Sequence, residues 1–137
     1  MATEILVNDG GAPARILPYV ADEAISAGEL ISIDADGEAQ LADSDHTGGQ
    51  NFSGIGWALT DAASGSIVNV ITGCGVVLNV QTDGSLTAGN ALMMSDTAGS
   101  MLLATNATTD PSTQAVLLES TAVGGGTAAG LWRVQTV

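Results

Sequence analysis

Residues 24–43 read AISAGELISIDADGEAQLAD, and residues 85–105 read SLTAGNALMMSDTAGSMLLAT. Each stretch passes from an aliphatic and a hydroxyl residue to Ala-Gly. An apolar run follows, then a turn that contains Gly37 or Gly99, then a second run that ends in Leu-Ala. A module that recurs at a fixed offset indicates a fold assembled from similar units. The repeated positions are turns and packing residues, and no nucleophile, base or metal ligand is repeated, which is typical of a scaffold.

The correspondence continues downstream of both stretches. Residues 57–61 and 67–70 match residues 116–120 and 131–134 in their pattern of apolar and polar residues. We therefore expect two similar halves, related by pseudo-twofold symmetry, within a single β domain. The expected domain covers residues 20–137, with internal repeats over about residues 24–80 and 85–137.

Short apolar runs separated by Gly, Asp, Asn, Ser and Thr predict strands throughout this domain. No segment keeps a helical period of 3.6 residues over three turns. The sequence thus predicts an all-β protein, either a small β-barrel or a β-sandwich. The predicted strands are residues 29–34, 38–42, 54–59, 66–71, 76–80, 91–95, 101–104, 115–119 and 131–135.

Residues 1–19 differ from the rest of the chain. Pro13 and Pro18 disfavour both a helix and pairing within the protein's own sheet. The segment is nevertheless rich in aliphatic residues, so we expect an extended N-terminal arm that lies along the domain or docks on a neighbour. Deletion of residues 2–17 is then expected to leave the domain folded. The residues expected to contact a neighbouring subunit or another partner are Ile5, Leu6, Val7, Arg15, Ile16, Leu17 and Tyr19.

The charge balance excludes several classes of partner. The chain has fifteen acidic residues, two arginines and no lysine, and its net charge is −13. Nucleic acids and anionic membranes are bound through Lys and Arg, so neither is an expected partner. The N-terminus lacks the basic start and apolar run of a secretion signal, and no apolar stretch approaches the length of a membrane span. We therefore expect the protein to be made in the cytoplasm.

Three features could be read as a catalytic or metal-binding site, but a structural role explains each of them better. The acidic run Asp34–Asp45 has the oxygens of a calcium loop but lacks the distal glutamate, so a solvated hairpin turn is favoured over a cation site. His46 lies in a polar loop with no nucleophile in a suitable setting. Cys74 lacks a neighbouring cation and is expected to be a small buried residue at a bend. These observations predict no catalytic residues, no metal and no cofactor.

Three phrases carry a resemblance to a known family. Ala27–Leu30 and Ala88–Leu92 flank the decapeptide Gly56–Gly65, which reads GWALTDAASG. The pattern resembles the small head-decoration, or capsid cement, proteins of tailed bacteriophages, in which G-x-A-L-x-D-A-A-x-G sits between two A-G-[DE]-x-[LV] phrases. The resemblance covers about residues 20–135. Asn90 departs from it, because the family has an acid there.

The resemblance implies a β-rich structural protein of the virion rather than an enzyme. Such a protein decorates and stabilises the outer surface of the capsid, commonly as a trimer, by binding the lattice of the major capsid protein. A carbohydrate-binding or adhesin-like surface module is an alternative, and a small hydrolase is a weaker one. A retaining glycosidase needs two carboxyl groups about 5 Å apart in a cleft. Sugar-binding sites, in glycosidases and in carbohydrate-binding modules, usually have aromatic platforms, and this chain has only four aromatic residues.

Overall fold

The computed structural model describes residues 5–8, 14–44, 54–84, 86–104, 114–120 and 130–137. These residues form eleven strands, which confirms the all-β prediction, and all nine predicted strands are present. Within the described ranges, no helix is long and apolar enough to cross a membrane. The strands are β1 (Leu6–Asn8), β2 (Arg15–Val20), β3 (Leu30–Ile33), β4 (Ala39–Leu41), β5 (Gly56–Ala58), β6 (Ile67–Thr72), β7 (Val77–Thr82), β8 (Ala91–Met94), β9 (Met101–Leu103), β10 (Ala115–Leu117) and β11 (Gly130–Thr136).

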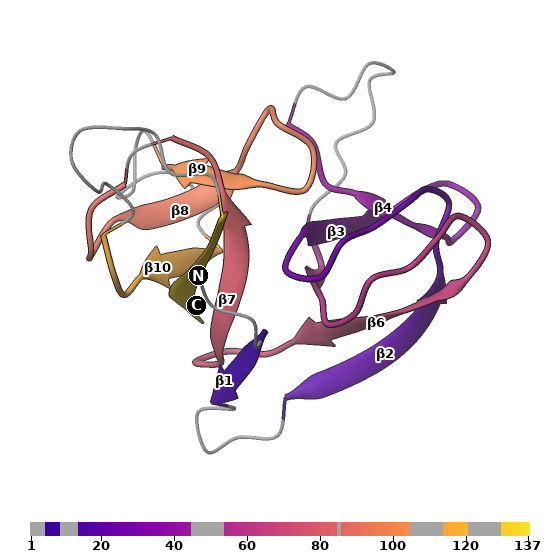
Figure 1. Cartoon of the computed structure of the whole chain (residues 1–137), viewed down its shortest axis with the longest axis horizontal. Coiled ribbons are helices and arrows are strands. Elements are labelled where there is room, and N and C mark those ends of the chain that lie inside the picture. The colour runs from indigo at the N-terminus through magenta and orange to yellow at the C-terminus, as the bar shows by residue number, and fades with distance from the viewer. Residues whose placement is uncertain (1–4, 9–13, 45–53, 85, 105–113, 121–129) are drawn as a thin grey trace.

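The strands form two sheets with the same internal order, one for each half of the chain (Figure 1). The first half has the order β2-β6-β5-β3-β4, and the second has β7-β11-β10-β8-β9, with β1 added beside β7. A parallel contact joins the two ends of each sheet: Ala21 pairs with Ala39, and Thr82 pairs with Met101. Each half is therefore a small closed sheet, which is the barrel rather than the sandwich alternative.

The registers align the two halves residue by residue. Val70 lies between Leu17 and Ala58 in the first sheet. Val134 lies in the same way between Leu78 and Leu117 in the second. The repeat read from the sequence is thus a structural repeat.

One of the two apolar clusters contains residues of both halves. The inside of the first sheet forms its own cluster around Ile31, Val68 and Val70. Leu30 and Trp57, from the outside of the first sheet, join the larger cluster that fills the second. Burial of large apolar side chains is the main favourable term in folding, so this shared cluster fixes the halves to each other.

The linker between the halves is clamped by the last strand. The Thr136 hydroxyl donates a hydrogen bond to the Gly73 carbonyl (2.7 Å) and accepts one from the Val76 N–H (2.9 Å). Cys74, between these two partners, is exposed, so the expectation that it is buried is wrong. Its neighbours Gly73 and Gly75 have positive φ, and the tight bend turns the Cys74 side chain outward.

The halves meet head to tail rather than about a twofold axis. Gly28, in the turn before β3, accepts a hydrogen bond from the Gln81 N–H (2.8 Å), and a methyl group added to it would overlap Leu131. The equivalent glycine of the second half, Gly89, has open space around it. A twofold axis would bury both turns equally, because each would meet the same patch on the other half. The expected pseudo-twofold symmetry is therefore wrong.

The N-terminal segment is part of the two sheets, which corrects the expectation that it cannot pair within its own chain. β1 pairs with β7, and β2 pairs with β6 along all six of its residues. Pro18 is tolerated because Ala21 donates its N–H to Ser66, toward β6. Strand N–H groups alternate between edges, so position 18 faces the outer edge, where no ladder bond is lost.

Ile5 and Ile16 provide a matched pair of mutations that tests whether the N-terminal segment stabilises the fold. Ile5 is 6% exposed and Ile16 is 47% exposed. We expect Ile5→Ala to lower the free energy of unfolding by about 2 to 4 kcal/mol, because it leaves a cavity beside β7. Ile16→Ala should change it by no more than about 0.5 kcal/mol. Urea denaturation followed by fluorescence measures both, and equal effects would contradict this role for the segment.

Gly28 and Gly89 test the head-to-tail contact. Both have φ near +88°, so alanine costs about 1 to 2 kcal/mol of backbone strain at either position. Only Gly28 lies under Leu131, so Gly28→Ala should lower the melting temperature further than Gly89→Ala does. Equal melting temperatures in differential scanning calorimetry would show that the turn at Gly28 is not packed against the second half.

Candidate interaction surface

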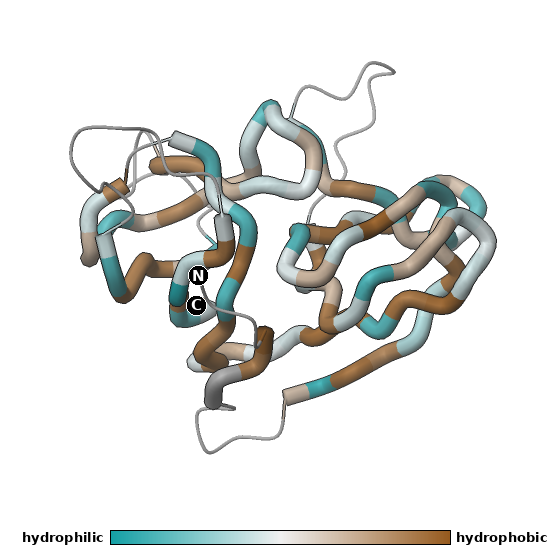
Figure 2. Tube along the Cα trace, viewed as in Figure 1, coloured by the Kyte–Doolittle hydropathy of each residue, from teal (hydrophilic) through white to brown (hydrophobic). Residues whose placement is uncertain are grey.

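The outer face of β2 and β6 is the main exposed apolar surface of the first half, and β2 is apolar along most of its length (Figure 2). Ile16 is 47% exposed, Val20 is 39% exposed and Ile67 is 56% exposed. Val20 lies opposite Ile67 in the register, so their side chains are cross-strand neighbours on one face. The outer edge of β2 meets β4 only at Ala21, and along the rest of β2 that edge pairs with no other described strand. We call this face, with Pro18 between its two ends, the β2–β6 face.

The structure places the seven predicted contact residues in different environments. Arg15 and Ile16 are exposed at the start of β2 and can contact a partner. Ile5 is buried, and Leu6 packs against the larger core cluster. Val7 is in β1, and its side chain lies outside the described part of the molecule. Leu17 and Tyr19 are half-buried, and Tyr19 packs against the core of the first half.

Sequence reasoning missed Val20 and Ile67. The exposure of Val20 follows from the two-residue period of strands, because Ile16, Pro18 and Val20 alternate with the half-buried Leu17 and Tyr19. Ile67 lies opposite Val20 in the register and so shares its face. The prolines excluded residues 15–20 from the predicted sheet, so the sequence alone does not indicate this face.

Each half has a turn with the same backbone hydrogen bonds but different capping chemistry. In residues 26–29 the Ser26 N–H donates to the Glu29 carboxylate (2.6 Å), and the Ala27 N–H donates to Asp61 (2.7 Å). In residues 87–90 the Thr87 N–H donates to the Asn90 amide oxygen (2.8 Å). The Ala88 N–H donates to the Ser120 hydroxyl (3.0 Å). The departure of Asn90 from the family pattern therefore preserves the cap and removes a charge.

Glu29 has a perturbed ionisation. Its side chain lies against Gly99 of the second half, and burial raises the pKa of its carboxyl group. The nearby carboxylates of Glu23 and Asp61 raise that pKa further, while the hydrogen bond from Ser26 opposes the shift. The ionised form of Glu29 is therefore less favourable in the folded protein than in the unfolded chain.

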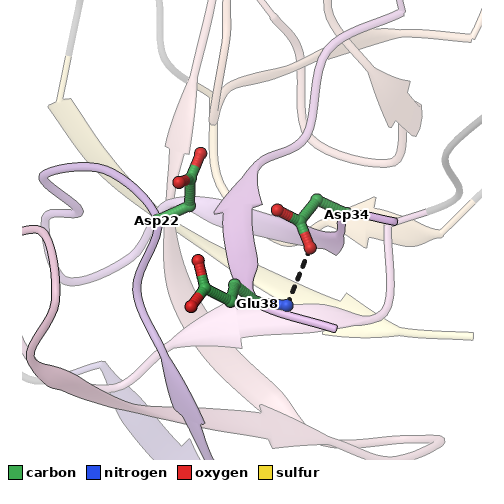
Figure 3. A group of neighbouring side chains, drawn as sticks. All are labelled: Asp22, Asp34 and Glu38. Carbon is green, nitrogen blue, oxygen red and sulfur yellow. Dashed lines mark hydrogen bonds between the residues drawn. The ribbon is translucent and has the colours of Figure 1, made fainter. Parts of the chain in front are cut away.

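Three acidic side chains come together beside the hairpin of β3 and β4 (Figure 3). Asp22, Asp34 and Glu38 each place an oxygen within 4.8 Å of the others. Asp34 already accepts hydrogen bonds from the N–H groups of Asp36 (2.9 Å) and Glu38 (2.8 Å). Its carboxylate therefore caps the hairpin turn, as the sequence predicted for this part of the acidic run. Asp45 and His46 lie outside the described residues.

The described cavities offer no catalytic constellation. One, of about 150 Å³, lies between β5 and the end of β11, where it is lined by Trp57, Gln114 and Val137. The other, of about 300 Å³, is lined by Asp83, Asp96 and Leu103. In the first, the Thr136 hydroxyl is engaged by the linker. In the second, Asp83 accepts a hydrogen bond from the Thr97 hydroxyl (2.8 Å). Among the described lining residues neither cavity has a histidine or cysteine.

Comparison with known proteins identifies the fold through a solved structure. No family model matches the chain. No curated protein matches it. The crystal structure of the head fiber gp8.5 N base of bacteriophage phi29 superposes with a TM-score of 0.60. It is 13% identical and covers 91% of this chain and 95% of its own. At that identity the likeness shows a shared fold.

Replacing Glu29 tests the origin of its pKa shift. The pKa of Glu29 is higher in the folded protein than in the unfolded chain, so the folded state favours the protonated carboxyl group. The free energy of unfolding therefore falls as the pH rises through the folded-state pKa. Glu29→Gln keeps an acceptor for Ser26 and should raise the melting temperature at neutral pH, with the advantage disappearing in acid. Glu119→Gln is the control, because Glu119 also caps a backbone N–H, that of Arg133. An equal gain from both variants at pH 7 would assign the effect to net charge alone.

Proposed function

We propose that this protein is a structural component of the outer surface of a bacteriophage head. The observation that carries the proposal is the fold, which is shared along almost the whole chain with the base of the phi29 head fiber. The capsid-cement resemblance of the three sequence phrases points to the same location. Its net charge of −13 is consistent with a module that leaves the packaged DNA alone.

In its finer form, the proposal is a decoration protein that stabilises the expanded shell by binding the major capsid protein lattice, as a trimer. We propose the Arg15–Ile16 end of β2 as the capsid contact. It combines an exposed cation with an exposed aliphatic side chain, on a chain that has only two arginines. This contact does not include Ile5, which is buried, or Leu6, which packs against the larger core cluster.

A second candidate is the attachment base of a head fiber, which the name of the phi29 structure favours. The two roles differ in copy number, because a cement protein is present in hundreds of copies and a fiber base in far fewer. Quantitative mass spectrometry of purified particles, calibrated against the major capsid protein, separates them. Absence of the protein from purified particles would reject both, and would leave the carbohydrate-binding and hydrolase alternatives to glycan arrays and substrate panels.

A binding assay on heads that lack the protein tests the contact at Ile16. Wild-type protein should bind expanded heads and not unexpanded ones, and Ile16→Lys should bind at least about tenfold more weakly, the equivalent of about 1.4 kcal/mol. Leu118→Lys is the matched control, since Leu118 is 42% exposed in the other half of the chain. Equal loss from both variants would exclude a specific contact at the start of β2.

The salt dependence of decoration tests what limits it. Closely packed copies of such an acidic protein repel one another, and this repulsion is screened over about 8 Å at physiological ionic strength but over about 30 Å at 0.01 M. We expect the number of bound copies to hold or rise as sodium chloride increases from low to physiological strength. Steady loss of copies over that range would instead show that ion pairs, with Arg15 or Arg133, dominate the attachment.

A further inference from the structure

The head-to-tail contact between the halves joins a turn of the first half to a strand face of the second. The equivalent strand face of the first half and the equivalent turn of the second half take no part in it. Inside the molecule, the turn 26–29 of the first half docks on β7 and β11, where Gly28 meets Leu131 and the carbonyl of Asn79. We call this the internal contact. A repeat built head to tail presents a free copy of each partner surface at its two ends.

One free surface is the end of the β2–β6 face at Val20 and Ile67. Val20 pairs with Ile67 as Gln81 pairs with Leu131, three residues beyond the aligned pairs Leu17–Val70 and Leu78–Val134. Ile67 therefore occupies the position of Leu131, the side chain that receives Gly28. Leu131 is half-buried and lies against Gly28 of the first half, whereas Ile67 is 56% exposed. Ile67 thus lies at the position that receives a turn in the other half, but no described turn of this molecule covers it.

The other free surface is the turn 87–90. Thr87, Ala88 and Gly89 are exposed, and open space surrounds Gly89. Leu103, in β9 of the same half, is 43% exposed. Its counterpart in the first half, Leu41, packs against Gly99 of the second half.

The backbone of β2 also reproduces a donor of the internal contact. Gln81 donates its N–H to Gly28 from the edge of β7. The Ala21 N–H points toward β6, so the alternation of a strand directs the Val20 N–H to the outer edge of β2. Val20 is the counterpart of Gln81, so its N–H lies where the carbonyl of an incoming Gly89 would be met.

Charge is suited to contact between copies at these two surfaces. The first turn is capped by the carboxylates of Glu29 and Asp61, and the second is capped by the neutral Asn90 and Ser120. A charged turn placed on the apolar face of another acidic molecule would carry a desolvation cost. The neutral turn avoids that cost, and it is the turn that is free.

We propose that one copy of the protein docks its turn 87–90 on the Val20–Ile67 end of the β2–β6 face of a second copy, repeating the internal contact between molecules. The new contact is weaker than the internal one. Leu30, Trp57 and Ile71 strengthen the internal contact, and their counterparts in the second half are the smaller or more polar Ala91, Val116 and Gln135. Self-association is therefore reversible and favoured where copies are concentrated, as on a surface.

Single substitutions at each surface test the proposal on the isolated protein. Wild type should self-associate in sedimentation velocity as its concentration rises toward about 1 mM, the range of weak complexes. Ile67→Lys and Ala88→Arg, both at exposed positions, should each weaken this association at least about tenfold. Ile16→Lys is the matched control, because Ile16 lies on the same strand about 14 Å from Val20. A wild type that stays monomeric, or an equal loss in the control, overturns the proposal.

Mixing the two variants tests the head-to-tail geometry. The Ile67→Lys copy keeps its turn, and the Ala88→Arg copy keeps its β2–β6 face, so an equimolar mixture should form dimers that grow no further. An interface in which each copy uses the same patch predicts no recovery, and failure of the mixture to dimerise therefore overturns the proposal. Circular dichroism of each variant establishes that it is folded.

These self-association experiments do not depend on capsid attachment, because they use the isolated protein without phage heads. If Ile16→Lys fails to bind heads yet self-associates normally, both proposals hold separately. If Ile67→Lys associates as wild type does, the contact between copies is wrong and the capsid contact is untouched.

Discussion

The structure depends on apolar side chains that lie outside one closed sheet and inside the core of the other. A closed sheet of five short strands encloses little volume, and the interior of the first half is filled largely by Ala, Val and Ile. Leu30, Trp57 and Ile71 point away from that interior and are buried only because the second half covers them. The first half would lack this cover alone, because the cluster that buries these three side chains is built largely from the second half.

The duplicated turn shows how a repeat can keep its shape while its ends diverge. Both turns need side-chain acceptors for the same two N–H groups, and both have a glycine at the same left-handed position. Where the turn is covered, the acceptors are carboxylates, one of them with an unfavourable ionisation. Where the turn is exposed, the acceptors are the Asn90 amide oxygen and the Ser120 hydroxyl. Backbone geometry is thus common to the halves, and surface charge distinguishes them.

Much of the fold was predictable because its signals are local. Glycine turns and alternating residues located nine strands, and the repeat followed from Ala27-Gly28 and Ala88-Gly89. The strand β2 was missed because prolines exclude central strands, whereas Pro18 faces a free edge. The symmetry between the halves was also missed, since a sequence repeat says nothing of how two units dock.

The candidate surface was only partly predictable for a related reason. Arg15 and Ile16 were identified and are exposed, but Ile5 is buried and Leu6 packs against the core, although both are as apolar as Ile16. Hydrophobicity alone cannot distinguish an anchor from a core residue, because that depends on whether β7 has a free edge for the segment to join. Val20 and Ile67 became visible only when β2 was placed opposite β6.

The clamp made by Thr136 bears on the order in which the protein folds. Every strand of the first half has left the ribosome long before residue 136 is made, so that half can close during synthesis. The linker is held between Gly73 and Val76 only when the last strand arrives and Thr136 bonds to both. The relative orientation of the halves is therefore fixed late, in a step that closes a loop of about sixty residues and is slowed by its length. Until then the apolar outside of the first half is exposed on the nascent chain, where the high negative charge of its surface helps to keep neighbouring chains apart.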